Sequence, residues 1–217
     1  MRVLCISDTH GYHDYLKIDE TADVVVCTGD FSNSRGLKNE AECFDFLNWF
    51  ASLGNKYKIL IAGNHDTTFE RRNAKDLMAE FPSIIYLEDS SVVIEGIKFY
   101  GTPWCPLFYD WAFMKRDSEL VDIFAQIDDD VQVLLTHTPA YGILDYATPN
   151  FCGSEALLNR IKNLKKLKFH VFGHIHECAG QIESVGTEDV ERYKAINAST
   201  FNYIEIKQPL EFEVFND

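Results

Sequence analysis

The sequence predicts a layered α/β fold. Short apolar runs rich in β-branched residues alternate along the chain with segments of helical periodicity, which is typical of layered α/β domains. With 217 residues, 46% of them hydrophobic, the chain is long enough to bury a full core as one domain. No repeat, linker or low-complexity tract divides the sequence, so we expect a single domain over residues 1–217.

The expected elements follow from periodicity and from turn residues. In the first half we expect strands at 3–6, 24–27 and 59–61 and helices at 39–53 and 68–81, which end near Gly54 and Pro82. Three closely spaced strands at 84–87, 92–94 and 97–100 indicate antiparallel hairpins. In the second half we expect helices at 118–126 and 154–162 and strands at 131–135, 169–172, 203–207 and 212–215.

The charge balance excludes several classes of partner. The chain has 34 acidic and 20 basic residues, a formal net charge of −14, which disfavours binding to duplex nucleic acid or to an anionic membrane surface. No run of 18 apolar residues occurs, and Asp8 interrupts the first apolar stretch too early for a signal-peptide core. We therefore expect a cytoplasmic protein. The sequence carries no signal for its oligomeric state.

Five of the apolar strands are followed at once by residues that bind metals or transfer protons. These tails are Ser7-Asp8-Thr9-His10, Gly29-Asp30, Gly63-Asn64-His65-Asp66, Thr136-His137 and Gly173-His174-Ile175-His176. In open α/β sheets, ligands bind beyond the carboxyl ends of the strands, so the tails are expected to converge on one crevice.

The tails contain more candidate ligands than one metal ion needs. The candidates are Asp8, His10, Asp30, Asn64, His137, His174 and His176. One ion that keeps a position open for water cannot use all seven, so we expect two divalent ions, with Asp30 as the natural bridging carboxylate. Oxygen and imidazole donors without thiolates favour manganese, iron, zinc or nickel over calcium.

The order of these motifs, D-x-H, G-D, G-N-H-D, a lone H and G-H-x-H, resembles that of the calcineurin-like metallophosphoesterase superfamily from Asp8 to His176. The strings IAGNHDTTFE, YGTPWCPLFYDWAF, LLTHTP, FGHIHE and INAST resemble its metallophosphodiesterase-domain group. The expected fold class is then an α/β four-layer α-β-β-α sandwich of two mixed sheets flanked by helices, with a dimetal site at the C-terminal ends of the strands.

The resemblance also implies the distribution of the ligands and the reaction. One ion is held by Asp8, His10, Asp30 and His176, and the other by Asp30, Asn64, His137 and His174. The implied reaction is hydrolysis of a phosphoester, with in-line attack by a hydroxide that bridges the two ions.

His65 and Asp66 are the expected catalytic residues. The resemblance leaves His65 unligated beside the phosphate. The adjacent Asp66 could orient the imidazole ring and raise its pKa, as a general acid for a leaving alkoxide requires. After Asp30 the sequence lacks the Asp-Arg pair of the serine/threonine protein phosphatases in the superfamily, which favours a small phosphodiester, such as a cyclic nucleotide, over a phosphoprotein.

Three residues are candidates for substrate binding. Trp104 and Trp111 belong to a segment, 104–113, with five aromatic residues in ten, which could stack a nucleobase or simply pack against the core. Arg71 follows the G-N-H-D motif and could clamp a substrate phosphate, although a solvated surface position is the simpler interpretation.

Other functions remain open at this stage. The alternative enzyme is a phosphomonoesterase or nucleotidase, and a nuclease on long DNA is disfavoured by the charge. A non-catalytic protein-interaction module on the same fold, like the small subunit of the retromer coat, is the competing class. The presence of all seven ligands and of His65 favours an enzyme.

Overall fold

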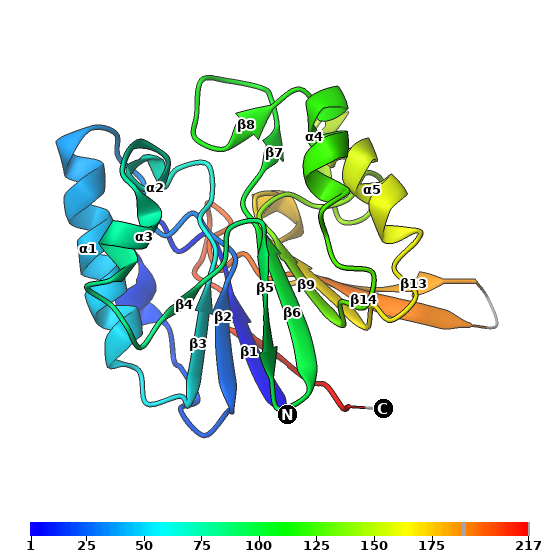
Figure 1. Cartoon of the computed structure of the whole chain (residues 1–217). Helices are drawn as coiled ribbons and strands as arrows, with labels where there is room; N and C mark the ends of the chain where they lie inside the picture. Colours follow the sequence, from blue (N-terminus) through cyan, green and yellow to red (C-terminus); the bar gives the residue numbers. More distant parts are fainter. Residues whose placement is uncertain (188–189, 217) are drawn as a thin grey trace.

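The computed structural model describes residues 1–187 and 190–216, and these residues form four layers (Figure 1). Two β-sheets pack face to face, and each is covered on its outer face by helices. The sheets and their helices make a mixed α/β sandwich of the α-β-β-α type, which confirms the predicted fold class.

The first sheet has five strands and carries the N-terminal half of the chain. Its spatial order is β15 (Leu210–Glu213), β1 (Arg2–Ile6), β2 (Val24–Cys27), β3 (Tyr57–Leu60) and β4 (Ile85–Tyr86). β15 is antiparallel to β1, and the other neighbours are parallel. The carboxyl ends of β1, β2 and β3 therefore lie at the same edge.

The second sheet has six strands. Its spatial order is β13 (Ile182–Gly186), β14 (Glu191–Asn197), β12 (Phe169–Phe172), β9 (Val133–Thr136), β6 (Ile97–Thr102) and β5 (Ser90–Ile94). The two outer pairs are antiparallel, whereas β14, β12, β9 and β6 are parallel. Two small pairs lie outside the sheets: β7 (Cys105–Pro106) with β8 (Met114–Lys115), and β10 (Tyr146–Ala147) with β11 (Asn150–Phe151).

The helices divide between the two outer layers (Figure 1). The first sheet is covered by α1 (Leu37–Ser52), α2 (Thr67–Arg71) and α3 (Ala74–Met78), and the second by α4 (Asp117–Phe124) and α5 (Glu155–Ile161). Two short 3-10 helices, η1 (His13–Tyr15) and η2 (His176–Cys178), follow β1 and β12. Across the described ranges, no helix combines the length and the apolar character that a membrane crossing needs.

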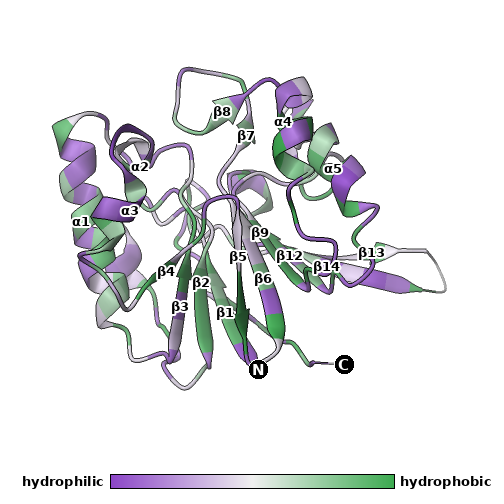
Figure 2. Cartoon of the chain, in the orientation of Figure 1, coloured by the Kyte–Doolittle hydropathy of each residue, from purple (hydrophilic) through white to green (hydrophobic). Residues whose placement is uncertain are grey.

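The central strands are mainly apolar (Figure 2), because each face of each sheet enters a different core. In β1, Val3 and Cys5 pack between the two sheets, whereas Leu4 and Ile6 pack toward α1. In β9, Leu134 packs toward α4 and α5 instead. Strands buried on both faces read as continuous apolar runs, which is the pattern from which the sequence predicts them.

Two expectations for the first half of the chain need correction. The helix expected at 68–81 is broken into α2 and α3, because Asn73 caps a new helix by accepting a hydrogen bond from the backbone N–H of Lys75. The strand expected at 84–87 is not part of a hairpin, since β4 pairs with β3 in parallel. The antiparallel hairpin of β5 and β6 is confirmed.

Two further corrections concern the C-terminal part. The strand expected at 203–207 is wrong: the side chain of Asn202 accepts hydrogen bonds from the backbone N–H groups of Ile204 and Glu205, which makes a turn there. β13 and β14 escape prediction because β13 is mostly exposed and charged residues interrupt β14, so neither has a continuous apolar run.

His170 in β12 is a packing residue, and it gives the fold a pH dependence. Its side chain is fully buried, its Nε2 lies 2.8 Å from Thr136 Oγ1, and its Nδ1 has no hydrogen-bond partner. Burial lowers the pKa of His170 to about 3. The unfolded chain therefore binds a proton at His170 from about pH 6.5 downward while the folded chain does not, so the free energy of unfolding falls with falling pH.

We predict that this dependence weakens in His170→Gln. Between pH 6.5 and pH 5, the metal-free wild type should lose about 1.6 kcal/mol more unfolding free energy than the variant, because the slope reaches about 1.4 kcal/mol per pH unit only well below pH 6.5. Urea unfolding of both proteins at the two pH values measures the difference. Parallel pH dependences would contradict the assignment.

Candidate metal centre

The seven predicted ligands come together at the edge where strands of both sheets end. Asp8 and His10 follow β1, Asp30 follows β2, and Asn64 lies just beyond β3. From the second sheet, the lone histidine follows β9 and the His-x-His pair follows β12. The two edges are joined by a backbone hydrogen bond, since the N–H of Thr200, beyond β14, donates at 2.8 Å to the carbonyl of Ser7, just after β1. The sequence motifs thus converge on one place.

Asp8, His10 and His176 form the first group of ligand atoms, and these lie within 4.8 Å of one another. Nε2 of His176 lies 3.3 Å from Asp8 Oδ1 and 3.3 Å from Nε2 of His10. The Nε2 of His10 lies 4.0 Å from Asp30 Oδ2, so the first group also borders Asp30, the expected bridging carboxylate. All three side chains are buried or nearly so.

The second group is arranged around His137. Its Nε2 lies 3.0 Å from Asn64 Oδ1 and 3.3 Å from Asp30 Oδ2. The ring of His174 is 5.0 Å from the ring of His137, measured between centroids. Asp30 therefore faces both groups, as a carboxylate shared between two ions would.

Hydrogen bonds on the far side of two imidazole rings show that the centre suits cations. Nδ1 of His137 lies 2.8 Å from the carbonyl oxygen of Thr28, and Nδ1 of His10 lies 3.1 Å from that of Ser32. A carbonyl accepts only, so each Nδ1 carries the proton, and in the neutral ring Nε2 presents a lone pair toward the carboxylates. Lone pairs facing carboxylate oxygens repel unless positive charge, from a second proton on the ring or from a metal ion, lies between them, so the donor set fits cations.

The pKa shifts of Asp30 and His137 agree with a centre that attracts positive charge. Burial alone would raise the pKa of Asp30, but the positive charges of His137 and His65 hold it well below its usual range. Burial would lower the pKa of His137, and the adjacent Asp30 instead raises it to about 9. The buried carboxylates thus stay ionised and attract positive charge.

The backbone at the centre adopts a conformation that is rare for non-glycine residues. Asp8, His10, Asp30 and His174 have positive φ values of 51°, 43°, 52° and 68°. Such conformations concentrate at functional sites, where the surrounding structure holds them in place. Gly173 lies so close that a Cβ there would overlap Asp8 Oδ2, so only glycine leaves room for the carboxylate.

Comparison with known proteins agrees with the geometry. A family model for calcineurin-like phosphoesterases matches residues 1–178. The chain belongs to the calcineurin-like phosphoesterase family. It is 34% identical to the human metallophosphoesterase domain-containing protein 1 over 98% of this chain and 71% of that protein. It is 35% identical to the UPF0046 protein T07D4.2 of Caenorhabditis elegans over 83% of this chain and 52% of that protein.

A solved structure shows the same fold at low sequence identity. The dimetal phosphatase from Danio rerio aligns with a TM-score of 0.57 and 12% identity, over 94% of this chain and 88% of that one. Together with the family match, the ligand groups support a metal-dependent phosphoesterase.

In this phosphoesterase, Asp66 holds the metal-binding loops rather than the His65 ring. The fully buried carboxylate of Asp66 accepts hydrogen bonds from the backbone N–H groups of Asp30, Ser32 and Gly63 and from the Ser32 hydroxyl. Its expected role in orienting His65 is therefore corrected to that of a positioning residue for Asp30. Burial and then the charge of Asp30 raise the pKa of Asp66 to about 7.

Asp66→Asn is expected to weaken metal binding indirectly. The amide would turn an N–H₂ group toward backbone donors, which we expect to lower the unfolding free energy by about 1–3 kcal/mol. Loss of this support for Asp30 should lower metal affinity by roughly 10- to 100-fold. Metal titration of the stripped protein measures the affinity.

The matched control for Asp66→Asn is Asp145→Asn. Asp145 is also buried and accepts hydrogen bonds from two backbone N–H groups, those of Gly142 and Gly153, but it belongs to neither ligand group. This variant should lose stability and keep its metal affinity. Equal metal affinities in the two variants would contradict the role of Asp66.

His65 and Trp111 lie together beside the metal ligands. Nε2 of His65 is 4.0 Å from Asp30 Oδ2, and its ring is 4.1 Å from the ring of Trp111 between centroids. The guanidinium of Arg35 covers the Trp111 ring at 3.8 Å. Arg71 lines a small adjoining pocket with Trp111, and its guanidinium donates to the carbonyl of Gly36. The structure thus brings His65 and Trp111 to the centre, with Arg71 at its edge.

The structure places Trp104 elsewhere. Its Nε1 donates to Asp89 at 2.8 Å, the ammonium of Lys115 lies 4.8 Å from the centre of its ring, and it lines a different cavity with Phe69 and Met78. Its expected role as a stacking platform is therefore corrected to packing.

Two functional contacts escaped prediction because β14, which leads to the first, was not among the expected strands, and the second lies where the sequence predicted a strand. The hydroxyl of Ser199, two residues beyond β14, donates to Asp8 Oδ2 at 2.9 Å. The ring of Tyr203 stacks on His176 with centroids 4.6 Å apart. The string INAST was the available signal for the first contact.

Proposed function

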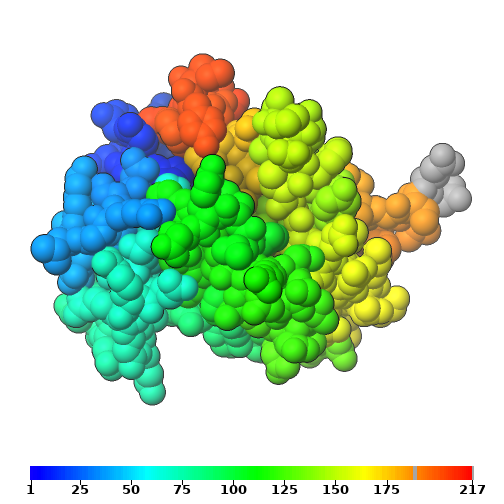
Figure 3. All heavy atoms as spheres, turned by 90° about the horizontal axis from the view of Figure 1, so that it is seen from above, coloured from blue at the N-terminus to red at the C-terminus, as the bar shows by residue number. Residues whose placement is uncertain are grey.

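We propose that this phosphoesterase hydrolyses small phosphodiesters, including cyclic nucleotides, with two bound divalent ions. The observation that carries the proposal is a cavity of about 690 Å³ that shares His174 with the metal centre. Its walls include Phe108, Tyr141, Phe151 and Tyr203. The segments around residues 108, 141–153 and 203 meet on the face where the strands end (Figure 3).

The walls of this cavity favour an uncharged aromatic group over a second phosphate. The ring of Phe108 lies 5.7 Å from that of His174 between centroids, so the cavity starts at a metal ligand. Among the described residues that line it, the charged ones are Asp117, Glu155 and Glu177, with no lysine or arginine. A phosphodiester is a monoanion, whereas a phosphomonoester is mostly a dianion near neutral pH and gains more from nearby lysine or arginine side chains. The cavity therefore supports a diester over a phosphomonoester.

Different residues of the centre bind the metal ions, position the carboxylates and donate a proton. When bound, the ions act as Lewis acids on the phosphoryl oxygens. Asp8, Asp30, Asn64 and the four histidine ligands hold them, and Ser199 and Asp66 orient the two carboxylates. His65 lies beside this set without belonging to the implied ligands, which suits it to donate a proton to the leaving oxygen.

One assay panel tests the proposal. Metal-stripped protein is reloaded with manganese, nickel, zinc, iron or magnesium and offered a chromogenic diester, a chromogenic monoester, and 2′,3′- and 3′,5′-cyclic nucleotides. We expect hydrolysis of diesters, with kcat/KM higher than for the monoester. No turnover under any metal would contradict an enzyme, and a preference for the monoester would favour the nucleotidase alternative. The proposed setting is the cytoplasm, with no duplex nucleic acid or membrane as a partner.

Phe108→Ala should distinguish nucleotide substrates from minimal ones. Stacking on an aromatic ring contributes about 1–3 kcal/mol per base, so KM for a cyclic nucleotide should rise by roughly 10-fold or more. KM for a minimal diester such as methyl 4-nitrophenyl phosphate should change little. The matched control is Phe215→Ala, because Phe215 is also an exposed phenylalanine, at 64% against 53% for Phe108, but does not line this cavity. Equal changes in KM for both substrates would contradict stacking at Phe108.

A further inference from the structure

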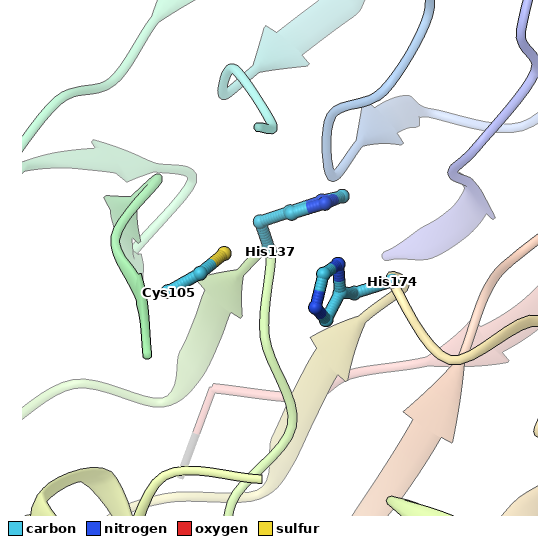
Figure 4. Close-up of side chains that lie close together, drawn as sticks. All are labelled: Cys105, His137 and His174. Atoms are coloured by element: carbon cyan, nitrogen blue, oxygen red, sulfur yellow. The ribbon is translucent and has the colours of Figure 1, made fainter. Parts of the chain in front are cut away.

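Cys105 lies against the part of the metal centre formed by His137 and His174. Its side chain is fully buried, and one ligand atom from each of the three residues lies within 4.8 Å of the others. Figure 4 shows the sulfur of Cys105 pointing toward the two histidines. The implied set of ligands, which consists of oxygen and nitrogen donors, does not include this thiol.

The spacing of the three residues is close to what one ion can span. In tetrahedral coordination, bonds of about 2.3 Å to sulfur and about 2.1 Å to imidazole nitrogen place these two donors about 3.6 Å apart. The ligand atoms of the three residues lie within 4.8 Å of one another without an ion. Side-chain movements of up to about 1 Å would therefore complete the coordination.

The backbone fixes Cys105 while its sulfur stays weakly engaged. The backbone N–H of Cys105 donates to the carbonyl of Phe113 at 2.8 Å, and β7 pairs with β8 at Cys105 and Met114. The thiol, which is a weak donor, donates to the carbonyl of Pro103 at 3.5 Å. Exchange of this contact for a metal bond would cost little.

We propose that Cys105 is a sulfur ligand to the ion held by His137 and His174, and that this site takes a thiophilic cation such as zinc or cobalt(II). The S–H bond breaks, the proton leaves to solvent and a sulfur–metal bond forms. The inference rests on the two-ion centre of the proposed function and not on its substrate. The two sites then differ, because the group of Asp8, His10 and His176 offers only oxygen and nitrogen.

The competing interpretation is that Cys105 is a small buried packing residue, as a thiol often is. Burial and the neighbouring carboxylates raise the pKa of Cys105, which keeps it a neutral thiol until a cation arrives. Cys5 is buried in the same way between the two sheets. Among the described cysteines, however, Cys105 is the one grouped with histidines at metal-binding distance.

X-ray absorption spectroscopy of the zinc-loaded full chain tests the proposal without any variant. We expect a sulfur neighbour of zinc at about 2.3 Å in addition to nitrogen and oxygen neighbours. A coordination shell of nitrogen and oxygen alone would overturn the proposal. This readout is independent of turnover, so an inactive protein with a zinc–sulfur bond would refute the proposed function and keep the role of Cys105.

Cobalt substitution provides the matched test with variants. The cobalt(II)-loaded wild type and Cys5→Ser should show a sulfur-to-metal charge-transfer band in the near ultraviolet, and Cys105→Ser should lose it. Zinc affinity should fall by at least about 10-fold in Cys105→Ser, with a smaller change for manganese, since soft thiolate ligands select zinc. A variant with lower thermal stability but unchanged metal affinities would show packing alone and would overturn the proposal.

Discussion

Replacing Asp30 by alanine is expected to lower kcat/KM for a chromogenic diester by about 10³-fold or more and to reduce the bound metal per chain. The reason is its position between the two groups of ligands. Its Oδ2 lies 3.3 Å from Nε2 of His137 and 4.0 Å from Nε2 of His10, so one substitution removes an oxygen ligand from both sites. Its Oδ1 also accepts the backbone N–H of His65 at 2.7 Å.

Metal content after dialysis and steady-state kinetics measure the two effects of Asp30→Ala. Asp30→Asn keeps the shape of the side chain and should retain the fold, with metal content lower than in the wild type. The matched control is Asp76→Ala, which removes an exposed carboxylate on α3 outside the centre and should leave activity and metal content unchanged. Full activity in Asp30→Ala would refute the two-metal assignment.

The core of the fold and the positions of the ligands were predictable because two simple rules act together. Central strands buried on both faces are continuous apolar runs, so β1, β2, β9 and β12 are visible in the sequence. Parallel strands end at a shared edge, so Asp8, Asp30 and His137, far apart in sequence, meet there. Neither rule needs knowledge of side-chain contacts.

The partners of Asp66 were not predictable, because they are backbone N–H groups of two loops that come together only in the folded chain. Because His65 precedes Asp66 in the sequence, we expected the carboxylate of Asp66 to bind the His65 ring. Instead, Ser32 donates to one oxygen of the buried carboxylate and Gly63 to the other. Satisfying a buried carboxylate requires such donors, and their source depends on the packing of the loops.

The positions of the aromatic residues expected to contact the substrate were the least predictable part of the site. The segment with five aromatic residues places Trp111 beside His65 and Phe108 at the cavity, but Trp104 packs against Asp89 and Lys115. These residues belong to one irregular loop, where no periodicity assigns side chains to a face. The other aromatic walls come from the turns at 141–151 and from the segment after β14, in which the expected strand is replaced by a turn.

His65→Asn is expected to lower kcat for a cyclic nucleotide by about 10²- to 10⁴-fold, the usual contribution of a general acid. The leaving group of a cyclic nucleotide is a sugar alkoxide, which needs a proton as the bond to phosphorus breaks. A 4-nitrophenolate leaves without protonation, so kcat for bis(4-nitrophenyl) phosphate should fall far less. The ratio of the two rates in one protein preparation measures the effect and is insensitive to the fraction of active enzyme.

The ratio separates proton donation from other roles of this histidine. His65 lies at metal-binding distance from His10 and Asp30 but is no member of the implied ligand set, so a role in proton donation alone requires metal content to stay at the wild-type value. His13→Asn is the control for a buried histidine outside the centre: its Nε2 lies 3.4 Å from Asp45, and its ring packs on Phe46. It should leave the ratio unchanged. Equal losses of kcat on the two substrates in His65→Asn would show that His65 positions the phosphate instead, because positioning favours both leaving groups alike.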